Sequence, residues 1–379
     1  MKDPSVLILV GSLGYGGAEM QVSLLAAALP AEGIRLQVAC FAAGPEYRAP
    51  IEAAGASVNI LPRGRDRRWF LRAYPEIVRL MRLHQVELVQ AFLPSFDIFA
   101  PFLRFAFPRV VVVTSRRTMD DRVPPRQLRM MRLTQPLVHA VVANSNAVAD
   151  SVRRFESVPE PRLRVIVNGI LPRPAVRPEE REAARRRFGL APDECAVLYL
   201  AHFRNGKGHQ HLPAVIRGVV ERHPRARFLV VGDMDSSSQY RTIAARFQRE
   251  VEAAGIAARV ITPGFQRDVA SCYAASDIVL NLSDFEGMSN VIMEAMNAAL
   301  PLVVSDAGGA RELVTDGVHA FVVPRADAPA AIERLGVLLA DDALGRRMGA
   351  AARAHIEETF SVTRLARAYA SLYRELLAR

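Results

Sequence analysis

The chain has 379 residues, half of them apolar, so it can bury two substantial hydrophobic cores, and its length favours two or three domains. The three cysteines, Cys40, Cys195 and Cys272, lack CxxC spacing and are typical of small buried side chains in a reducing compartment. No apolar run approaches about 18 residues, so no membrane-spanning helix is expected, and the early start of an apolar strand leads us to expect no signal peptide.

The charge is unevenly distributed along the chain. The first 170 residues carry 22 Lys and Arg against 14 Asp and Glu, whereas the remaining residues carry 27 against 25. A one-sided basic surface favours an anionic partner, such as a membrane face, a phosphorylated or lipid-diphosphate acceptor, or nucleic acid. The alternative is an arginine-rich composition without any such partner, but it leaves the nearly neutral second half unexplained.

The chain opens with an unbroken apolar run at residues 6–10, which is suited to a central parallel strand. Glycines follow, including Gly16 and Gly17, and a helix is predicted from residue 18 to about residue 29. Glycines let the backbone approach a ligand closely, and the helix start favours an anion. A dinucleotide fingerprint is absent, because Glu19 stands where GxGxxG needs its third glycine.

Further strands are predicted at residues 35–41, 57–61, 87–92, 110–114, 141–145 and 165–169. Two segments between them, 63–83 and 99–107, mix aromatic residues with arginine and are candidate membrane-contacting faces, although core packing is the favoured interpretation. The loop after residue 114 supplies Arg116, Arg117 and Asp120 as candidates on the acceptor side. Residues 122–132 form another basic stretch suited to an anionic acceptor.

Residues 171–192 are rich in proline, arginine and glutamate and predict a linker that leads into a short helix. A new strand at 196–201 then opens the second domain. It is followed by a glycine-flanked turn that contains Lys207, one of only two lysines in the chain. A compact ammonium in such a turn is suited to a diphosphate. The turn is not a Walker loop, because no Ser or Thr follows the lysine.

The stretch 284–309 reads DFEGMSNVIMEAMNAALPLVVSDAGG and predicts an acidic loop, a helix, a strand and a Gly-Gly turn. It follows an apolar strand at 277–280, and further strands are predicted at 228–233 and 260–265. Glu286 would lie in the loop, and Glu294 would lie one turn above Asn290 on the helix. Carboxylates accept hydrogen bonds from sugar hydroxyls, and a helix N-terminus receives an anion. A capping acid beside a solvated glutamate is the alternative interpretation of this spacing.

The E-x7-E pair of Glu286 and Glu294, the EAM and PLVVSDAGG segments and RELVTDG together resemble the retaining glycosyltransferases of family four, which have the GT-B fold. The resemblance covers residues 6–360 and is strongest over 197–324. It implies an α/β protein of two Rossmann-like domains that face each other across a cleft. The expected domains are residues 1–175 on the acceptor side and 176–360 for the nucleotide sugar, with a helix at 361–379 that returns to the first domain.

The resemblance also implies roles for individual residues. Glu286 would contact the donor sugar, Glu294 the ribose, and Lys207 the phosphates, with Arg204 as a substitute for the arginine that relatives carry where this chain has His202. Many relatives place a donor-contacting histidine in this loop, where this chain has Arg116 and Arg117 instead, so no general base is assigned. The remaining donor-binding positions are Gly16, Gly17, Gly264, Phe265, Gly287, Met288, Ser289, Asn290 and Val291.

The expected function is retaining transfer of a sugar from a nucleotide-diphosphate sugar to a glycan or lipid-linked acceptor, as in polysaccharide, lipopolysaccharide or glycolipid synthesis. Neither a cofactor nor a metal is expected, and nucleic acid is not an expected partner. The expected location is the cytoplasm, at or near the inner face of the membrane. A GT-B epimerase or phosphorylase is an alternative, as is a dinucleotide-dependent oxidoreductase, and a membrane- or anion-binding module would explain the basic half alone. The residues do not specify the sugar, the base, the acceptor or the oligomeric state.

Overall fold

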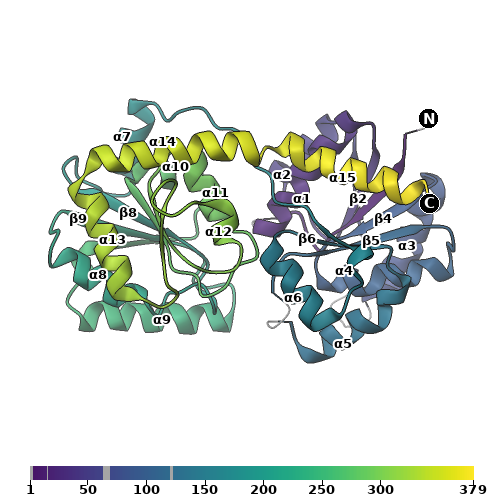
Figure 1. Cartoon of the computed structure of the whole chain (residues 1–379), viewed down its shortest axis with the longest axis horizontal. Helices are drawn as coiled ribbons and strands as arrows, with labels where there is room; N and C mark the ends of the chain where they lie inside the picture. The colour runs from purple at the N-terminus through teal and green to yellow at the C-terminus, as the bar shows by residue number, and fades with distance from the viewer. Residues whose placement is uncertain (1–2, 15, 63–68, 120–122) are drawn as a thin grey trace. The chain divides into compact units, whose positions relative to one another are not determined.

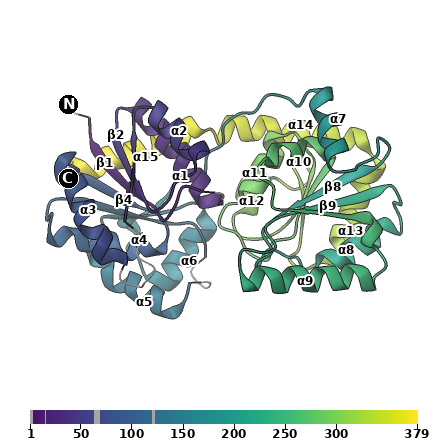
Figure 2. The same cartoon turned by 180° about the vertical axis from the view of Figure 1, so that it is seen from behind.

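The computed structural model describes residues 3–14, 16–62, 69–119 and 123–379, and the chain divides into two compact units. The first unit comprises Met1–Leu171 and Phe360–Arg379, and the second comprises Pro172–Thr359. Each unit has a parallel sheet with helices packed against it (Figures 1 and 2). This is the doubly wound arrangement that alternating strands and helices predict.

The described part of the first unit forms a seven-stranded sheet in the order β3-β2-β1-β4-β5-β6-β7, and every neighbouring pair is parallel. The strands are β1 (Ser5–Leu9), β2 (Arg35–Cys40), β3 (Ser57–Ile60), β4 (Leu88–Ala91), β5 (Val111–Arg116), β6 (Ala140–Ala143) and β7 (Leu163–Val165). The helices are α1 (Gly17–Ala28), α2 (Pro45–Ala53), α3 (Trp69–Leu83), α4 (Pro94–Phe99), α5 (Pro125–Thr134), α6 (Asn146–Glu156) and α15 (Val362–Leu377). Short 3-10 turns are η1 (Leu29–Glu32), η2 (Ala100–Phe105), η4 (Gln135–Leu137) and η5 (Glu160–Arg162).

Alternate residues of β1 supply two different cores, because successive side chains of a strand point to opposite faces. Val6 and Ile8 belong to a cluster that contains residues of α1 and α15. Leu7 and Leu9 belong to another cluster, which contains residues of α3, α4 and η2. The first sheet is therefore buried on both faces, as its continuous apolar strands predict.

The last helix, α15, packs on the first unit, so the expected return of the chain is confirmed. Its side chains Tyr369 and Tyr373 are fully buried in the core that contains β1 and α1. The Tyr373 hydroxyl donates to Oε1 of Gln90 on β4 at 3.3 Å. Where the chain re-enters this unit, the N–H of Ile170 donates to the carbonyl of Phe360 at 2.8 Å.

The described part of the second unit forms a six-stranded parallel sheet in the order β10-β9-β8-β11-β12-β13. The strands are β8 (Cys195–Leu200), β9 (Ala226–Val231), β10 (Val260–Gly264), β11 (Ile278–Asn281), β12 (Leu302–Ser305) and β13 (Phe321–Val323). The helices are α7 (Pro178–Arg187), α8 (Leu212–Val220), α9 (Ser238–Ala253), α10 (Val269–Ala275), α11 (Asn290–Asn297), α12 (Ala310–Leu313), α13 (Ala328–Ala340) and α14 (Asp342–Thr359), with the 3-10 turn η6 (Ala257–Arg259).

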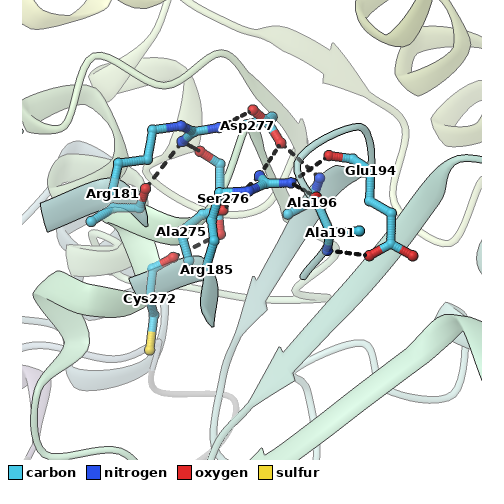
Figure 3. Close-up of polar contacts among 10 residues, drawn as sticks. Arg181, Arg185, Ala191, Glu194, Ala196, Cys272, Ala275, Ser276 and Asp277 are labelled. Atoms are coloured by element: carbon cyan, nitrogen blue, oxygen red, sulfur yellow. Dashed lines mark hydrogen bonds and ion pairs between the residues drawn. The ribbon is translucent and has the colours of Figure 1, made fainter. Parts of the chain in front are cut away.

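A polar network fixes α7 to the start of β11 (Figure 3). Arg185 is buried and donates to the carbonyl of Ala275 and to Oδ2 of Asp277, each at 3.2 Å. Arg181, one turn earlier on α7, donates to the carbonyl of Ser276 at 2.9 Å and also pairs with Asp277. The linker helix is thereby attached to the strand whose far end carries the Glu286 loop.

Two strands differ from their predictions. The strand expected at 165–169 ends at Val165, because the chain turns there and Gly169 packs against α15, where an added Cβ would lie 3.0 Å from the Cα of Val362. Strand β13 was not predicted from its three-residue apolar run. None of the described helices is long and apolar enough to cross a membrane.

Candidate active site

The lysine turn after β8 is packed closely against the loop after β11. Gly206 and Gly208 have φ of +83° and +73°, a backbone conformation that glycine adopts without strain. A Cβ on Gly206 would lie 1.9 Å from the ring of Phe285, and one on Gly208 would lie 2.0 Å from the carbonyl oxygen of Leu282. The N–H of Asp284 also donates to the carbonyl of Gly206 at 2.9 Å. Both glycines are therefore required for the two loops to meet.

This packing brings the Nζ of Lys207 into an ion pair with Oε1 of Glu286. The same oxygen accepts a hydrogen bond from the Ser283 hydroxyl at 2.9 Å. The buried Tyr199 of β8 holds the turn in place, because its hydroxyl donates to the carbonyl of Lys207. The two ionic side chains are 16% and 13% exposed, so they are sheltered but still reachable from solvent. An ion pair in such a setting is held more firmly than one on an open surface.

Glu286 leads into the backbone segment of Gly287, Met288, Ser289, Asn290 and Val291, which the structure places at the start of α11. The segment is held by the Gly-Gly turn after β12: the N–H of Gly309 donates to the carbonyl of Gly287 at 3.0 Å. Gly308 approaches so closely that an added Cβ would lie 1.7 Å from the carbonyl oxygen of Glu286. Ser289 occupies the N-cap position of α11 but makes no side-chain capping bond. The positive end of the α11 dipole therefore lies beside Glu286.

Glu294 lies on α11 and is 8% exposed. The hydroxyl of Tyr273, on α10, donates to its Oε2 at 2.9 Å. Burial raises the pKa of Glu294 above its usual value, while the nearby Arg173 and the Tyr273 hydroxyl act in the opposite direction. The carboxylate is thus a sheltered acceptor on the helix whose N-terminus lies beside Glu286.

Three further predicted residues lie at the end of β10 and in the lysine turn. Gly264 ends β10 with φ of +73°, and the ring of Phe265 is 41% exposed. His202 stacks with the rings of Phe265 and Tyr240, with centroid distances of 6.2 and 6.1 Å, and its Nδ1 accepts from the N–H of Asp233 at 3.3 Å. Arg204 is exposed in the turn that also contains Lys207.

The two arginines predicted on the acceptor side, Arg116 and Arg117, have different surroundings. Arg116 is buried in ion pairs with Glu156 and, at 3.3 Å, with Asp97, so it holds α4 and α6 against the sheet. Arg117 instead donates to Oδ1 of Asn168, and its guanidinium lies 5.8 Å from the centroid of the Phe92 ring.

Arg117 belongs to the charge environment of the glycine turn at the start of α1. Burial lowers the pKa of Arg117, while Tyr369 and the Glu19 carboxylate favour its charged form. Gly16 is the N-cap of α1 and Gly17 its first residue. A Cβ on Gly16 would lie 2.1 Å from Oε2 of Glu19, so that carboxylate folds over the turn. Asp120 lies outside the described residues.

The lysine turn, the Glu286 loop and α11 are therefore assembled within one unit, whereas Gly16, Gly17 and Arg117 belong to the other. Tyr273, Ser283 and Arg173 support the two carboxylates but were not predicted, because no motif marks them. Within the described residues, no group of three His, Cys, Asp or Glu side chains is arranged to hold a metal.

Two family models account for most of the chain. Residues 15–172 match the model described as Glycosyltransferase Family 4, and residues 180–355 match Glycosyl transferases group 1. The chain belongs to glycosyltransferase family 4. The second match contains the lysine turn, both glutamates and the Gly-Gly turn, so the E-x7-E unit of this family 4 protein lies within the group 1 match.

Relatives with curated names match over part of their length. N-acetyl-alpha-D-glucosaminyl L-malate synthase of Bacillus anthracis is 28% identical over 193 residues, which are 51% of this chain and 49% of the relative. A D-inositol 3-phosphate glycosyltransferase of Xylanimonas cellulosilytica is 30% identical over 225 residues, which are 57% of this chain and 52% of the relative. The match spans about half the length of these relatives.

Solved structures match over nearly the whole chain. Anabaena HepE in complex with UDP and glucose has a TM-score of 0.81 at 21% identity, covering 97% of this chain and 99% of that one. WaaG, a glycosyltransferase involved in lipopolysaccharide biosynthesis, has a TM-score of 0.73 at 16% identity, covering 97% and 99%. The family 4 protein therefore has the GT-B fold, as the sequence motifs predicted.

Proposed function

We propose that this protein transfers a sugar from a nucleotide-diphosphate sugar to a glycan or lipid-linked acceptor, with retention of the anomeric configuration. The observation that carries the proposal is the pairing of Lys207 with Glu286 beside the N-terminus of α11. Glu294 lies further along the same helix. A cation, a helix N-terminus and two carboxylates in one unit match the three parts of such a donor: diphosphate, sugar and ribose.

The electrostatics follow from the bond that breaks. Cleaving a glycosyl–phosphate bond leaves positive charge on the sugar ring and negative charge on the departing diphosphate. Lys207 and the positive end of α11 stabilise that negative charge, and the exposed Arg204 adds a second cation. Preorganised charges of this kind supply the largest contribution in many enzymes, typically about 10²–10³ in rate for one donor.

Glu286 orients the donor sugar in this proposal and does not attack it. One of its oxygens already accepts from Ser283 and pairs with Lys207, so the carboxylate is held in a fixed position. Lys207 thereby contacts both Glu286, which orients the sugar, and the diphosphate, which is the leaving group. Glu294, sheltered beneath Tyr273, accepts hydrogen bonds from the ribose hydroxyls.

Relatives suggest where the acceptor and donor should be sought. The HepE structure contains UDP, and WaaG is involved in lipopolysaccharide biosynthesis, so UDP-sugars and lipid-linked glycans are the first compounds to test. We place the reaction in the synthesis of surface polysaccharide or glycolipid, on the cytoplasmic side of the membrane. Arg117, next to the glycine turn of the first unit, is the candidate for acceptor binding.

The test is a panel of UDP-, GDP-, ADP- and dTDP-sugars, with NAD as a control, measured as shifts of the thermal unfolding midpoint. A ligand that binds only the folded protein raises the midpoint, so one sugar nucleotide should do so and NAD should not. An NMR spectrum of the product should then show the donor's anomeric configuration. A shift with NAD alone would contradict the proposal, and an inverted product would contradict retention.

A further inference from the structure

We propose that Asp284 is a positioning residue of the donor site: it fixes the lysine turn against the Glu286 loop and does not itself contact substrate. Asp284 lies two residues before Glu286, in the loop that follows β11. Its effect on turnover rests on the proposed function, whereas its effect on the lysine turn can be measured without any donor. An acid so close to Glu286 would otherwise be a candidate for the chemistry itself.

The contacts of Asp284 reach the lysine turn on both sides of Lys207. Before the lysine, the carbonyl of Gly206 accepts from the main-chain N–H of Asp284 at 2.9 Å. After it, Nε2 of His211 lies 2.9 Å from Oδ1 of Asp284, and Nε2 of Gln210 donates to Oδ2 at 2.8 Å. An ionised carboxylate only accepts, so Nε2 of His211 is the donor. One residue therefore holds the turn at points that lie on either side of the lysine.

The partners of Asp284 are themselves fixed in the second unit. His211 occupies the N-cap position of α8, and its N–H donates to the carbonyl of Gly208 at 3.0 Å. The carbonyl of Asp284 accepts from Nη1 of Arg325 at 3.4 Å. The main-chain N–H, the carbonyl and both carboxylate oxygens of Asp284 are thus engaged by protein groups. Because a displacement of about 1 Å at a reacting group can cost about 10²-fold in rate, such restraints bear directly on turnover.

The carboxylate of Asp284 differs from that of Glu286 in how it is occupied. Glu286 receives Lys207 and Ser283 on the same oxygen, Oε1. Both oxygens of Asp284 instead accept from side chains that precede α8. A carboxylate turned toward a diphosphate would also repel it. These contacts assign Asp284 to the support of the Lys207–Glu286 ion pair and not to the sugar or the phosphates.

An aspartate beside a histidine is also the arrangement of a proton-transferring pair, in which the carboxylate orients the imidazole for general-base catalysis. The two interpretations differ in the effect of one substitution. In His211→Gln, the amide nitrogen can replace Nε2 as the donor to Asp284, but the amide cannot act as a base. His211→Gln therefore separates a positioning role from proton transfer.

The experiment uses the two lysines of the chain, Lys2 and Lys207. The full-length protein is labelled briefly with acetic anhydride, well below its unfolding midpoint, and mass spectrometry gives the labelling rate of Lys207 relative to that of Lys2. We expect Asp284→Ala and His211→Ala each to raise this ratio about fivefold, because the ammonium is held less firmly against Glu286. His211→Gln should keep the wild-type ratio.

The same variants are then assayed with the sugar nucleotide that stabilises the protein. Asp284→Ala should lose about 10²-fold in kcat and His211→Ala about tenfold, whereas His211→Gln should keep most of the wild-type kcat and its pH profile. The matched control is Asp193→Ala, which removes an exposed carboxylate that pairs with Arg225 at 3.9 Å in the same unit. This control should change neither the labelling ratio nor the turnover.

The His211 variants test the same contact if Asp284→Ala does not fold. An unchanged labelling ratio in His211→Ala would overturn the positioning role, as would an equal change in Asp193→Ala. A His211→Gln protein with the wild-type labelling ratio but the turnover of His211→Ala would assign proton transfer to the histidine and overturn it too. An absence of sugar-nucleotide turnover in the wild type would contradict the proposed function and leave the labelling result in force, because labelling needs no donor.

Discussion

The ammonium of Lys207 pairs with the carboxylate of Glu286 across 79 residues of sequence. The pair exists because two glycines let the lysine turn lie against the loop that carries the glutamate, where Phe285 and Leu282 leave no room for a side chain. The position of the Lys207–Glu286 ion pair thus depends on Gly206 and Gly208, which have no side chain to contact a ligand.

Gly206→Ala should damage this arrangement more than an ordinary glycine substitution. The new Cβ would both occupy a positive φ and collide with the Phe285 ring, so we expect a loss of about 2–4 kcal/mol in the free energy of unfolding, with weaker donor binding. Urea unfolding measures the first effect. Gly255→Ala is the matched control, since Gly255 has φ of +68° with open space around it and should show only the backbone cost of about 1 kcal/mol. Equal losses in the two variants would contradict the packing role of Gly206.

Arg173 should set the pH at which nucleotide affinity declines. Its main-chain N–H donates to Asn297 at 3.3 Å and its carbonyl accepts from Arg353 at 2.7 Å, which holds it near Glu294. Ribose binding uses the ionised Glu294, so affinity is lost as the pH falls through the pKa of that carboxyl.

Removing the Arg173 charge with Arg173→Gln raises the pKa of Glu294 and moves this loss to higher pH, whereas Arg173→Lys should behave like the wild type. Titration calorimetry with the nucleotide at a series of pH values measures the shift. An unchanged pH profile in the glutamine variant would exclude Arg173 from this role, while an absence of nucleotide binding in the wild type would count against the donor site itself.

Glu294→Gln should weaken nucleotide binding without lowering the stability of the fold at pH 7. Burial raises the pKa of Glu294 in the folded protein above its value in the unfolded chain, so the folded state binds this proton more tightly. The contribution of Glu294 to stability is therefore fully present below the unfolded pKa of about 4.5 and is lost as the pH rises through the folded pKa. The glutamine variant should be at least as stable as the wild type at pH 7 while binding nucleotide far more weakly. A clear loss of stability at pH 7 would show that the carboxylate stabilises the fold.

Arg116→Met tests the structural role assigned to that residue. It leaves Asp97 and Glu156 buried without their cation, so we expect about 3–5 kcal/mol lower free energy of unfolding. Adding Glu156→Gln should recover part of the loss. Arg153→Met is the control, because its ion pairs with Asp150 and Glu160 lie on the surface and their loss should leave stability nearly unchanged. An Arg116→Met protein as stable as the wild type would contradict this structural role.

The neighbours Arg116 and Arg117 show why part of the site could not be predicted. Arg116 ends β5 and Arg117 follows it in extended order, where successive side chains point to opposite sides, so one meets Glu156 and the other Asn168. Which face is which depends on the helices that cover the sheet, and the local sequence does not contain that information. The supports of the two carboxylates, Tyr273 and Ser283, were missed because no local motif marks either of them.

More of the fold than of the site could be predicted, because strands and helices are marked by local sequence patterns. Apolar runs punctuated by glycine and proline mark most strands, and the motif around Glu286 and Glu294 predicts a strand, loop and helix that the structure contains. Strand β13 was missed because three residues are too few to show a period. Strand β7 ends early because Gly169 must meet α15, a contact from the far end of the chain.

The most direct test of the central claim is the rate of nucleotide release from the sugar nucleotide that stabilises the protein. Wild type, Glu286→Gln, Lys207→Met and the control Glu333→Gln should be compared; Glu333 is exposed on α13 of the same unit. We predict that the first two variants lose at least about 10²-fold in turnover with unchanged unfolding midpoints, and that the control keeps wild-type turnover. Wild-type turnover in either Glu286→Gln or Lys207→Met would contradict the assignment of this ion pair to the active site.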